Sequence, residues 1–404
     1  MSNETKNKLV PELRFPEFRN KESWEDKLLG EISEIVRGGS PRPIEAFLTT
    51  DSNGLNWLKI GDVKSDSKYI THVKERVVPE ALSNTREISP GDLILSNSMS
   101  FGRPYISNIK TCIHDGWIAI RNINKKVERD FLYYVILNEA SQQFFLINAA
   151  GAAVKNLNAE IIKLLPVAIP SPEEQQKIAD CLSSLDELIT AQSQKLQALK
   201  AHKKGLMQQL FPAEGETVPK LRFAEFKDSG DWEEKVIGET AKVTTGNKDT
   251  QNKVDNGLYP FFVRSQTIER INSYSYDGEA ILTSGDGVGV GKNFHYINGK
   301  FDYHQRVYCI YNFNKNICGQ FVYLYFSEHF NERVMRMSAK NSVDSVRMAM
   351  ITEMPIFLPS LKEQQKIADC LSSLDEQISA QTEKIETLKT HKKGLMQALF
   401  LSEL

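Results

Sequence analysis

A fourteen-residue segment that occurs twice constrains the fold of this chain more than any other feature. Residues 174–187 read EQQKIADCLSSLDE, and residues 363–376 repeat the same letters. When the copies are extended to 174–211 and 363–400, 29 of 38 positions match at a constant offset of 189. A repeat of this length within one chain indicates that a structural unit has been duplicated.

A second, shorter repeat lies upstream of each copy. Residues 10–31 and 218–239 share the frame VPxLRFxEF followed by WExKxxGE. The sequences between the two repeats differ, and the first is longer: Val10 to Glu174 spans 164 positions, whereas Val218 to Glu363 spans 145. Two dissimilar bodies within one duplicated frame predict two versions of the same task, directed at different targets.

The longer repeat has the features of a capped helix. Ser171 is a favourable N-cap, Pro172 fits the first helical position, and Glu174 completes a capping box that Ser360 and Glu363 repeat. Apolar residues then recur alternately every four and three positions, as in a coiled-coil seam. The seam comprises Ile178, Leu182, Leu185, Ile189, Leu196 and Leu199 in the first copy, and Ile367, Leu371, Leu374, Ile378, Ile385 and Leu388 in the second. Gln192 and Gln381 interrupt it, either to fix the register or because they lie at a solvated edge.

These patterns predict an α+β protein. Two mixed α/β domains, residues 1–170 and 213–359, are separated by two long helices, residues 171–212 and 360–404. The 38 repeated residues of each helix would span roughly 57 Å at 1.5 Å per residue. We expect the helices to pack as an antiparallel coiled coil with pseudo-twofold symmetry.

Composition and motif searches argue against several classes of protein. No apolar run approaches the roughly 20 residues of a membrane span, and the N-terminal segment lacks a signal-peptide core, so we expect a cytoplasmic protein. The cysteines and histidines show no metal-ligand spacing. The glycine-rich segment 284–292 departs from a phosphate-binding loop, and no Pro-Pro pair is present for an adenine methyltransferase motif. The sequence therefore predicts no catalytic residue, no metal site and no cofactor bound by this chain.

The loops of both bodies carry side chains suited to DNA. Arginine, lysine, asparagine and glutamine can address base edges, and serine and lysine suit phosphates. The net charge of −2 requires any basic surface to be local. The DNA-binding candidates are Ser96, Asn97, Ser98, Arg103, His114, Lys155 and Asn156 in body one, and Arg264, Ser265, Gln266, Lys292, Asn293, His304, Gln305, Arg306, Lys340, Asn341 and Arg347 in body two.

The segments described so far resemble the specificity subunits of Type I restriction–modification systems. A Leu-Pro or Met-Pro segment leads through a second proline into EQQKIA and a long helix, at Leu165–Ala179 and again at Met354–Ala368. The WExKxxGE entries at Trp24 and Trp232 are similar to the start of that family's target recognition domains. The likeness covers nearly the whole chain.

The resemblance implies a non-catalytic DNA-binding subunit. Each body would be a target recognition domain for one half of a split, asymmetric DNA site, and the helices would act as spacer and docking sites for two methyltransferase subunits. Restriction subunits can join such complexes, and S-adenosylmethionine, Mg²⁺ and ATP would be bound by the partner subunits.

Two other readings of the sequence compete with this one. A stand-alone enzyme acting on nucleic acid would need a catalytic set, and the motif search finds none. A coiled-coil scaffold without a DNA role explains the helices but leaves the two divergent bodies with polar loops unexplained.

Overall fold

The structure, a computed structural model, describes residues 9–64, 67–97, 101–149, 157–213, 215–337 and 345–401. The chain divides into two compact units, Met1–Ser193 with Lys384–Leu404, and Gln194–Glu383. The two long helices, α5 (Pro172–Leu210) and α9 (Leu361–Leu399), each contribute residues to both units. The division of labour between recognition domains and spacer helices stays a prediction.

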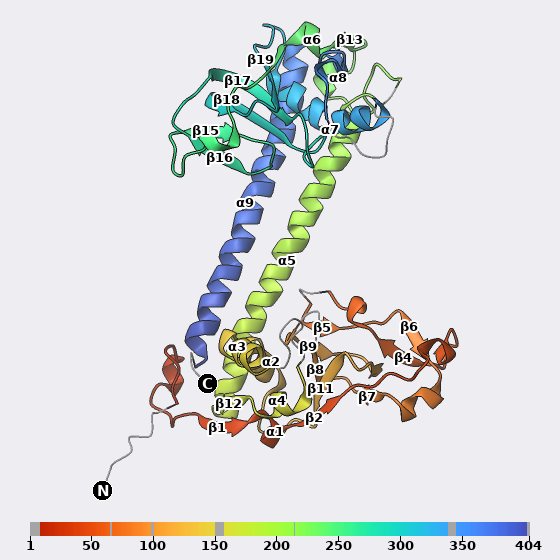
Figure 1. Cartoon of the computed structure of the whole chain (residues 1–404), viewed down its shortest axis with the longest axis vertical. Coiled ribbons are helices and arrows are strands. Elements are labelled where there is room, and N and C mark those ends of the chain that lie inside the picture. The colour runs from red at the N-terminus through yellow and green to blue at the C-terminus, as the bar shows by residue number, and fades with distance from the viewer. Residues whose placement is uncertain are drawn as a thin grey trace. The chain divides into compact units, whose positions relative to one another are not determined.

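The described residues of unit 1 form three β-sheets and four short α-helices beside its portions of α5 and α9 (Figure 1). Strands β1 (Glu25–Leu28) and β12 (Pro166–Ile169) pair antiparallel. One five-stranded sheet has the order β3 (Leu48–Thr49), β6 (Glu75–Val77), β4 (Leu55–Leu58), β10 (Thr111–Ile113), β7 (Arg86–Ile88). The other has the order β2 (Glu34–Arg37), β11 (Trp117–Arg121), β8 (Leu93–Ser96), β9 (Pro104–Ser107), β5 (Tyr69–Ile70). The helices are α1 (Leu29–Ile32), which forms a single turn, and α2 (Arg129–Leu137), α3 (Glu139–Asn148) and α4 (Ala159–Lys163).

Unit 2 has an equivalent two-stranded sheet, but its described residues form one larger sheet in place of the two five-stranded sheets of unit 1. Strands β13 (Glu233–Val236) and β20 (Pro355–Leu358) pair antiparallel. The six-stranded sheet has the order β14 (Lys242–Thr245), β19 (Val307–Tyr311), β17 (Tyr276–Ser284), β18 (Phe294–Tyr303), β15 (Tyr259–Phe262), β16 (Ile268–Ile271). Its helices are α6 (Ile237–Thr240), α7 (Gly319–Met337) and α8 (Met348–Thr352).

The predicted antiparallel packing of the long helices is observed within each unit (Figure 1). In unit 1, Ile178 and Leu182 of α5 share a core with Leu399 of α9. In unit 2, Leu210 of α5 shares a core with Ile367 and Leu371 of α9. The remaining predicted seam residues are buried or half-buried, and so are the two seam glutamines.

The predicted capping boxes are only half formed. Ser171 Oγ accepts the Glu174 backbone N–H at 3.4 Å, and Ser360 does the same for Glu363. The carboxylates of both glutamates instead bind buried arginines: Arg14 holds Glu174 through two contacts of 2.7 Å, and Arg222 holds Glu363 through contacts of 2.7 and 2.8 Å. The first turns of α5 and α9 therefore anchor the two copies of the shorter repeat, residues 10–31 and 218–239.

Helices α2 and α3 follow each other directly in the sequence but do not form one continuous helix. Asn138 adopts an extended conformation and separates α2 from α3. The Ser141 hydroxyl donates to the Val135 carbonyl at 2.7 Å, and the Gln142 side chain donates to the Ile136 carbonyl at 2.7 Å. These side chains bond carbonyls near the end of α2 that a continuous helix would bond through its backbone.

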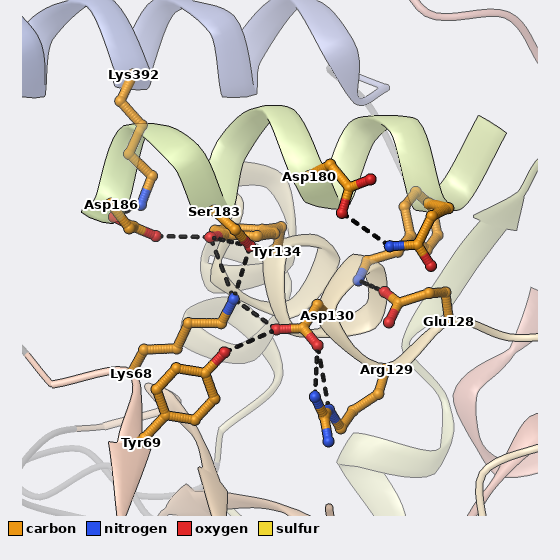
Figure 2. Close-up of polar contacts among 12 residues, drawn as sticks. Lys68, Tyr69, Glu128, Arg129, Asp130, Tyr134, Asp180, Ser183, Asp186 and Lys392 are labelled. Carbon is orange, nitrogen blue, oxygen red and sulfur yellow. Dashed lines mark hydrogen bonds and ion pairs between the residues drawn. The ribbon is translucent and has the colours of Figure 1, made fainter. Parts of the chain in front are cut away.

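A network of half-buried charges ties strand β5 to the helices of unit 1 (Figure 2). The Lys68 ammonium lies 2.6 Å from Asp130 at the start of α2 and 3.0 Å from Ser183 on α5. Tyr134 donates to Asp186 of α5 at 2.7 Å, and Lys392 of α9 lies 2.5 Å from the same carboxylate. Burial raises the pKa of Asp130, but Lys68 and Arg129 outweigh that effect and the net pKa is lowered. The carboxylate is therefore held ionised between two cations.

Candidate nucleic-acid interface

One tight turn occurs at the same place in both units. In unit 1 it joins β10 to β11 at His114–Trp117, and in unit 2 it joins β18 to β19 at His304–Val307. The backbone carbonyl of the histidine that begins each turn accepts the N–H of the residue three positions later. The His114–Trp117 bond measures 3.0 Å and the His304–Val307 bond 2.9 Å. Histidine Nδ1 also accepts the N–H two residues later, at 2.8 Å from Gly116 and 2.9 Å from Arg306. Each turn is thus fixed by its own histidine.

The turn in unit 1 is surrounded by polar side chains that meet at Asp115. The Ser40 hydroxyl donates to its carboxylate at 2.8 Å, and Arg42 lies 3.4 Å from the other oxygen. The backbone carbonyl of Asp115 accepts from Arg37 Nε and from the Asn97 side chain, each at 3.0 Å. The hydrogen bond from Ser40 lowers the pKa of Asp115 and outweighs its partial burial. An ionised carboxylate therefore sits beside Arg42, while Arg37 is held by the backbone carbonyl of the same residue.

We call each turn, together with the polar side chains around it, a corner. The corner of unit 2 is built around Asp286, as that of unit 1 is around Asp115. Arg264 lies 3.0 Å from one carboxylate oxygen and Arg306 lies 3.7 Å from the other. The Asn293 side chain donates to the Arg264 carbonyl at 3.1 Å and to Ser284 Oγ at 3.2 Å. Gln266 donates to the Lys292 carbonyl at 3.0 Å. Six candidates from three separate segments of the sequence are thereby brought together: Arg264, Ser265, Gln266, Lys292, Asn293 and Arg306.

Burial separates the candidates into two groups. Ser96, Asn97, Asn293 and His304 are buried and shape the corners from beneath. The side chains that reach solvent are Arg264, Gln266, Lys292, Gln305, Arg306 and Arg347 in unit 2. Arg103 and His114 in unit 1 and Ser265 in unit 2 are half-buried.

The half-buried Arg103 has unsatisfied hydrogen-bonding capacity. Its Nε is buried without a hydrogen-bond partner among the residues that the structure describes, and so is Ser96 Oγ on the neighbouring strand. The matching position in unit 2 is filled by Asn293, which does satisfy Ser284. The guanidinium of Arg103 instead lies over the Tyr105 ring, 5.8 Å from its centroid. The two corners therefore share a backbone frame but differ in chemistry.

Burial lowers the pKa of both turn histidines. For His114 the nearby Asp115 opposes this effect without reversing it. For His304 the charge of Arg264 acts in the same direction as burial. Both rings are therefore neutral near pH 7, as an Nδ1 acceptor must be.

Five predicted residues lie outside the described residues: Ser98, Lys155, Asn156, Lys340 and Asn341. Sequence reasoning also missed residues that the corners use, namely Arg37, Ser40, Arg42, Asp115, Asp249 and Asp286. The segment RGGSPR at 37–42 offered a signal, because glycine, proline and arginine cluster there. The carboxylates offered none, since an anionic side chain is not sought at a surface meant for DNA.

In the part of the chain that the structure describes, no three histidine, cysteine, aspartate or glutamate side chains gather as a metal site would require. Within the same residues, no helix is both long and apolar enough to cross a membrane.

Known proteins also contain the two similar units described above. The sequence matches the Type I restriction modification DNA specificity domain over residues 21–201 and again over 229–390. The chain therefore belongs to the family of Type I restriction–modification specificity subunits.

Among curated relatives, the MjaVIII specificity subunit of Methanocaldococcus jannaschii is 23% identical over 96% of this chain and 94% of its own length. The EcoDI specificity subunit of Escherichia coli is 30% identical over 42% of this chain and 37% of its own length. The first likeness runs nearly end to end.

Two solved structures share the fold. The S subunit of a Type I restriction–modification system from M. genitalium aligns with a TM-score of 0.64 at 14% identity, covering 97% of this chain and 99% of that chain. A chain from a study of complex assembly and conformational transition of the type I R-M system aligns with a TM-score of 0.56 at 17% identity, covering 94% and 98%.

Proposed function

We propose that this chain reads a DNA site made of two dissimilar halves, one with each unit. The observation that carries the proposal is the matched pair of corners at His114–Trp117 and His304–Val307, which share a turn but surround it with different side chains. In this proposal residues 1–170 and 213–359 are the target recognition domains, and residues 171–212 and 360–404 are the spacer.

The exposed arginines of each corner supply the contacts with DNA. Arginine binds phosphates and can also address guanine with two hydrogen bonds. Arg42 has 82% of its side-chain surface exposed and Arg306 has 66%. Each lies near a carboxylate that limits its range of positions. A sequence that pairs with one arrangement has no reason to pair with the other, so the complete site is asymmetric.

The chain would act within a larger complex and contribute no catalytic group. Two methyltransferase subunits dock on it, and restriction subunits can be added. S-adenosylmethionine, Mg²⁺ and ATP are held by those partners. A joint clamp on the DNA also accounts for a net charge of −2 in a DNA-binding chain.

The direct test is co-expression with a methyltransferase subunit, followed by mapping of adenine methylation with long-read sequencing. We expect one split, asymmetric motif that requires this chain. Arg306→Ala should weaken or relax the half read by unit 2 and leave the other half unchanged, and Arg42→Ala should do the reverse. A variant that alters both halves equally would contradict the assignment of one half-site to each unit.

The role of the helices as spacer can be tested separately. One heptad inserted between Ala191 and Leu199, with a matched heptad between Ala380 and Leu388, should lengthen the gap between the half-sites and leave their bases unchanged. An unchanged gap in a complex that still methylates would refute the spacer role.

A further inference from the structure

The glycine-rich loop between β17 and β18 presents one apolar side chain to solvent. Val288 is 98% exposed, more than any other large apolar side chain in the described ranges. Its neighbour Val290 is only 7% exposed and lies in the core of unit 2. The two valines are two positions apart in one loop, so their opposite placement is a property of the loop's conformation.

The ends of the loop are held firmly. The Gly285 N–H donates to the Arg306 carbonyl at 2.7 Å, and the Val346 N–H donates to the Gly285 carbonyl at 2.7 Å. The Asn293 N–H donates to the Gly289 carbonyl at 2.9 Å. Gly287 and Gly291 have φ values of +78° and +66°, which other residues rarely adopt. The sequence thus encodes a raised tip at Val288 on an anchored base.

Cations surround the base of this tip. Arg264 and Arg306 both lie on Asp286, two residues before the valine, and the exposed Lys292 follows it. Three positive side chains against two carboxylates, Asp286 and the Asp249 that lies 4.0 Å from His304, leave a net positive surface around an apolar point. A polyanion that also offers an apolar group fits this combination better than a neutral partner does.

Duplex DNA has both properties. Its phosphates attract the cations, and the C5-methyl group of thymine is the apolar feature of the major groove, where it contacts aliphatic side chains. We propose that Val288 contacts the C5-methyl group of a thymine in the half-site read by unit 2, while Asp286 positions Arg264 and Arg306 beside it. This inference rests on the proposed function and adds a base-reading residue to it.

Replacing thymine by uracil tests the contact because it removes only the methyl group. The full chain, in complex with its methyltransferase subunits, is titrated with duplexes carrying the mapped site at one fixed salt concentration. Each thymine of both half-sites is replaced in turn by uracil. Wild type, Val288→Ala and Leu258→Ala are compared, the last being a control at another exposed apolar residue of unit 2 (69% exposed).

We expect one uracil replacement in the half-site of unit 2 to weaken wild-type binding about three- to fivefold, the worth of one buried methyl group. Val288→Ala should weaken binding to the thymine duplex by a similar factor and should not respond to that replacement. Leu258→Ala should respond as wild type does.

The inference is overturned if Val288→Ala keeps the full wild-type response, or if no uracil replacement in that half-site affects wild type. A half-site without an A·T pair would overturn it as well. A complex that binds DNA without sequence preference would instead refute the proposed function, and the inference with it.

Discussion

The two units repeat their framework residue by residue and differ in how each sheet is attached to it. Arg14–Glu174 in unit 1 corresponds to Arg222–Glu363 in unit 2. The rings of Trp24 and Phe131 lie 6.1 Å apart, and those of Trp232 and Phe321 lie 5.8 Å apart. Lys392–Asp186 in unit 1 has its counterpart in Lys203–Asp375 in unit 2. The duplicated sequence therefore produces duplicated contacts.

The part of the unit 1 network centred on Lys68 and Asp130 has no such counterpart among the described residues of unit 2. Aligning Phe131 with Phe321 places Gln320 at the position of Asp130 and Leu324 at that of Tyr134. Gln320 donates to Ser372 at 2.7 Å, a single neutral contact. Lys68 belongs to the longer body and finds its partners on α2 and α5. The difference teaches that the framework positions both bodies, while the longer body needs an additional attachment.

The largest effect is expected at the arginine–glutamate pairs, where the units should behave alike. Arg14→Met leaves Glu174, only 1% exposed, as an uncompensated buried charge, and Arg222→Met does the same to Glu363. Each change should lower the free energy of unfolding of its own unit by about 3–5 kcal/mol. Urea denaturation followed by hydrogen exchange and mass spectrometry assigns the loss to a unit.

A suitable control replaces both partners. Arg14→Met combined with Glu174→Leu should recover part of the loss, because no unpaired charge remains. Losses below about 1 kcal/mol would contradict the view that these pairs fix the frame.

The next effect should distinguish the units. Lys68→Met removes one cation from Asp130 but leaves Arg129, so we expect unit 1 to lose about 1–3 kcal/mol, as for hydrogen bonds to charged groups. Gln320→Ala, at the matched position in unit 2, should cost about 1 kcal/mol. Protection of α2 amides and of α7 amides from exchange provides the two readouts. Equal losses would mean that the additional network is not a stronger attachment.

Acid should weaken both units through the same turn. The pKa of His114 and that of His304 are lowered in the folded state, mainly by burial. As the pH falls below about 6.5, the two histidines therefore take up protons more readily in the unfolded chain than in the folded chain. The stabilisation is complete above the unfolded-state pKa of about 6.5 and is lost as the pH falls below it.

Asparagine retains a side-chain acceptor but does not titrate in this range. His114→Asn and His304→Asn should therefore each flatten the fall in stability of one unit between pH 7 and pH 5. Thermal denaturation across that range, with hydrogen exchange to assign the unit, provides the measurement. If the stability of both variants falls between pH 7 and pH 5 as steeply as that of the wild type, the turn histidines are not the cause of the acid sensitivity.

The smallest effect belongs to a pair of exposed contacts. Lys177 and Glu17 lie 3.4 Å apart in unit 1, and Lys366 and Glu225 lie 3.4 Å apart in unit 2, with all four side chains about half exposed. Glu17→Ala and Glu225→Ala should leave urea midpoints unchanged within error, because solvent screens such pairs. A clear shift in one unit only would reveal a difference in the framework that the sequence repeat conceals.

Sequence patterns predicted what depends on local periodicity and on repetition. The apolar seams that begin at Ile178 and Ile367 predicted the two long helices, and the duplicated sequence predicted two similar units. The fate of Glu174 could not be predicted, because its carboxylate binds Arg14, 160 residues away. Lys68 and Ser183 are likewise separated by 115 residues. Such contacts depend on how the chain returns to itself, which no local pattern records.

The candidate site was predicted in part for the same reason. Cationic and amide side chains such as Arg264 and Arg306 are recognisable by type, so they could be selected from loops. Asp115 and Asp286, which bring such residues together, could not be identified before the turns were placed. Val288 resembled any other loop valine until its exposure was known.

The sharing of α9 between the units has a consequence for synthesis on the ribosome. The core of unit 1 includes Met396, Leu399 and Phe400, whereas unit 2 is complete at Glu383. Domains usually fold in the order in which they emerge, the N-terminal one first. Here residues 9–193 emerge early but must wait for α9, so unit 2 has all its residues before unit 1 does. The apolar surface of α2 and of the first half of α5 that Met396, Leu399 and Phe400 cover would therefore stay exposed until the last residues of the chain are synthesised.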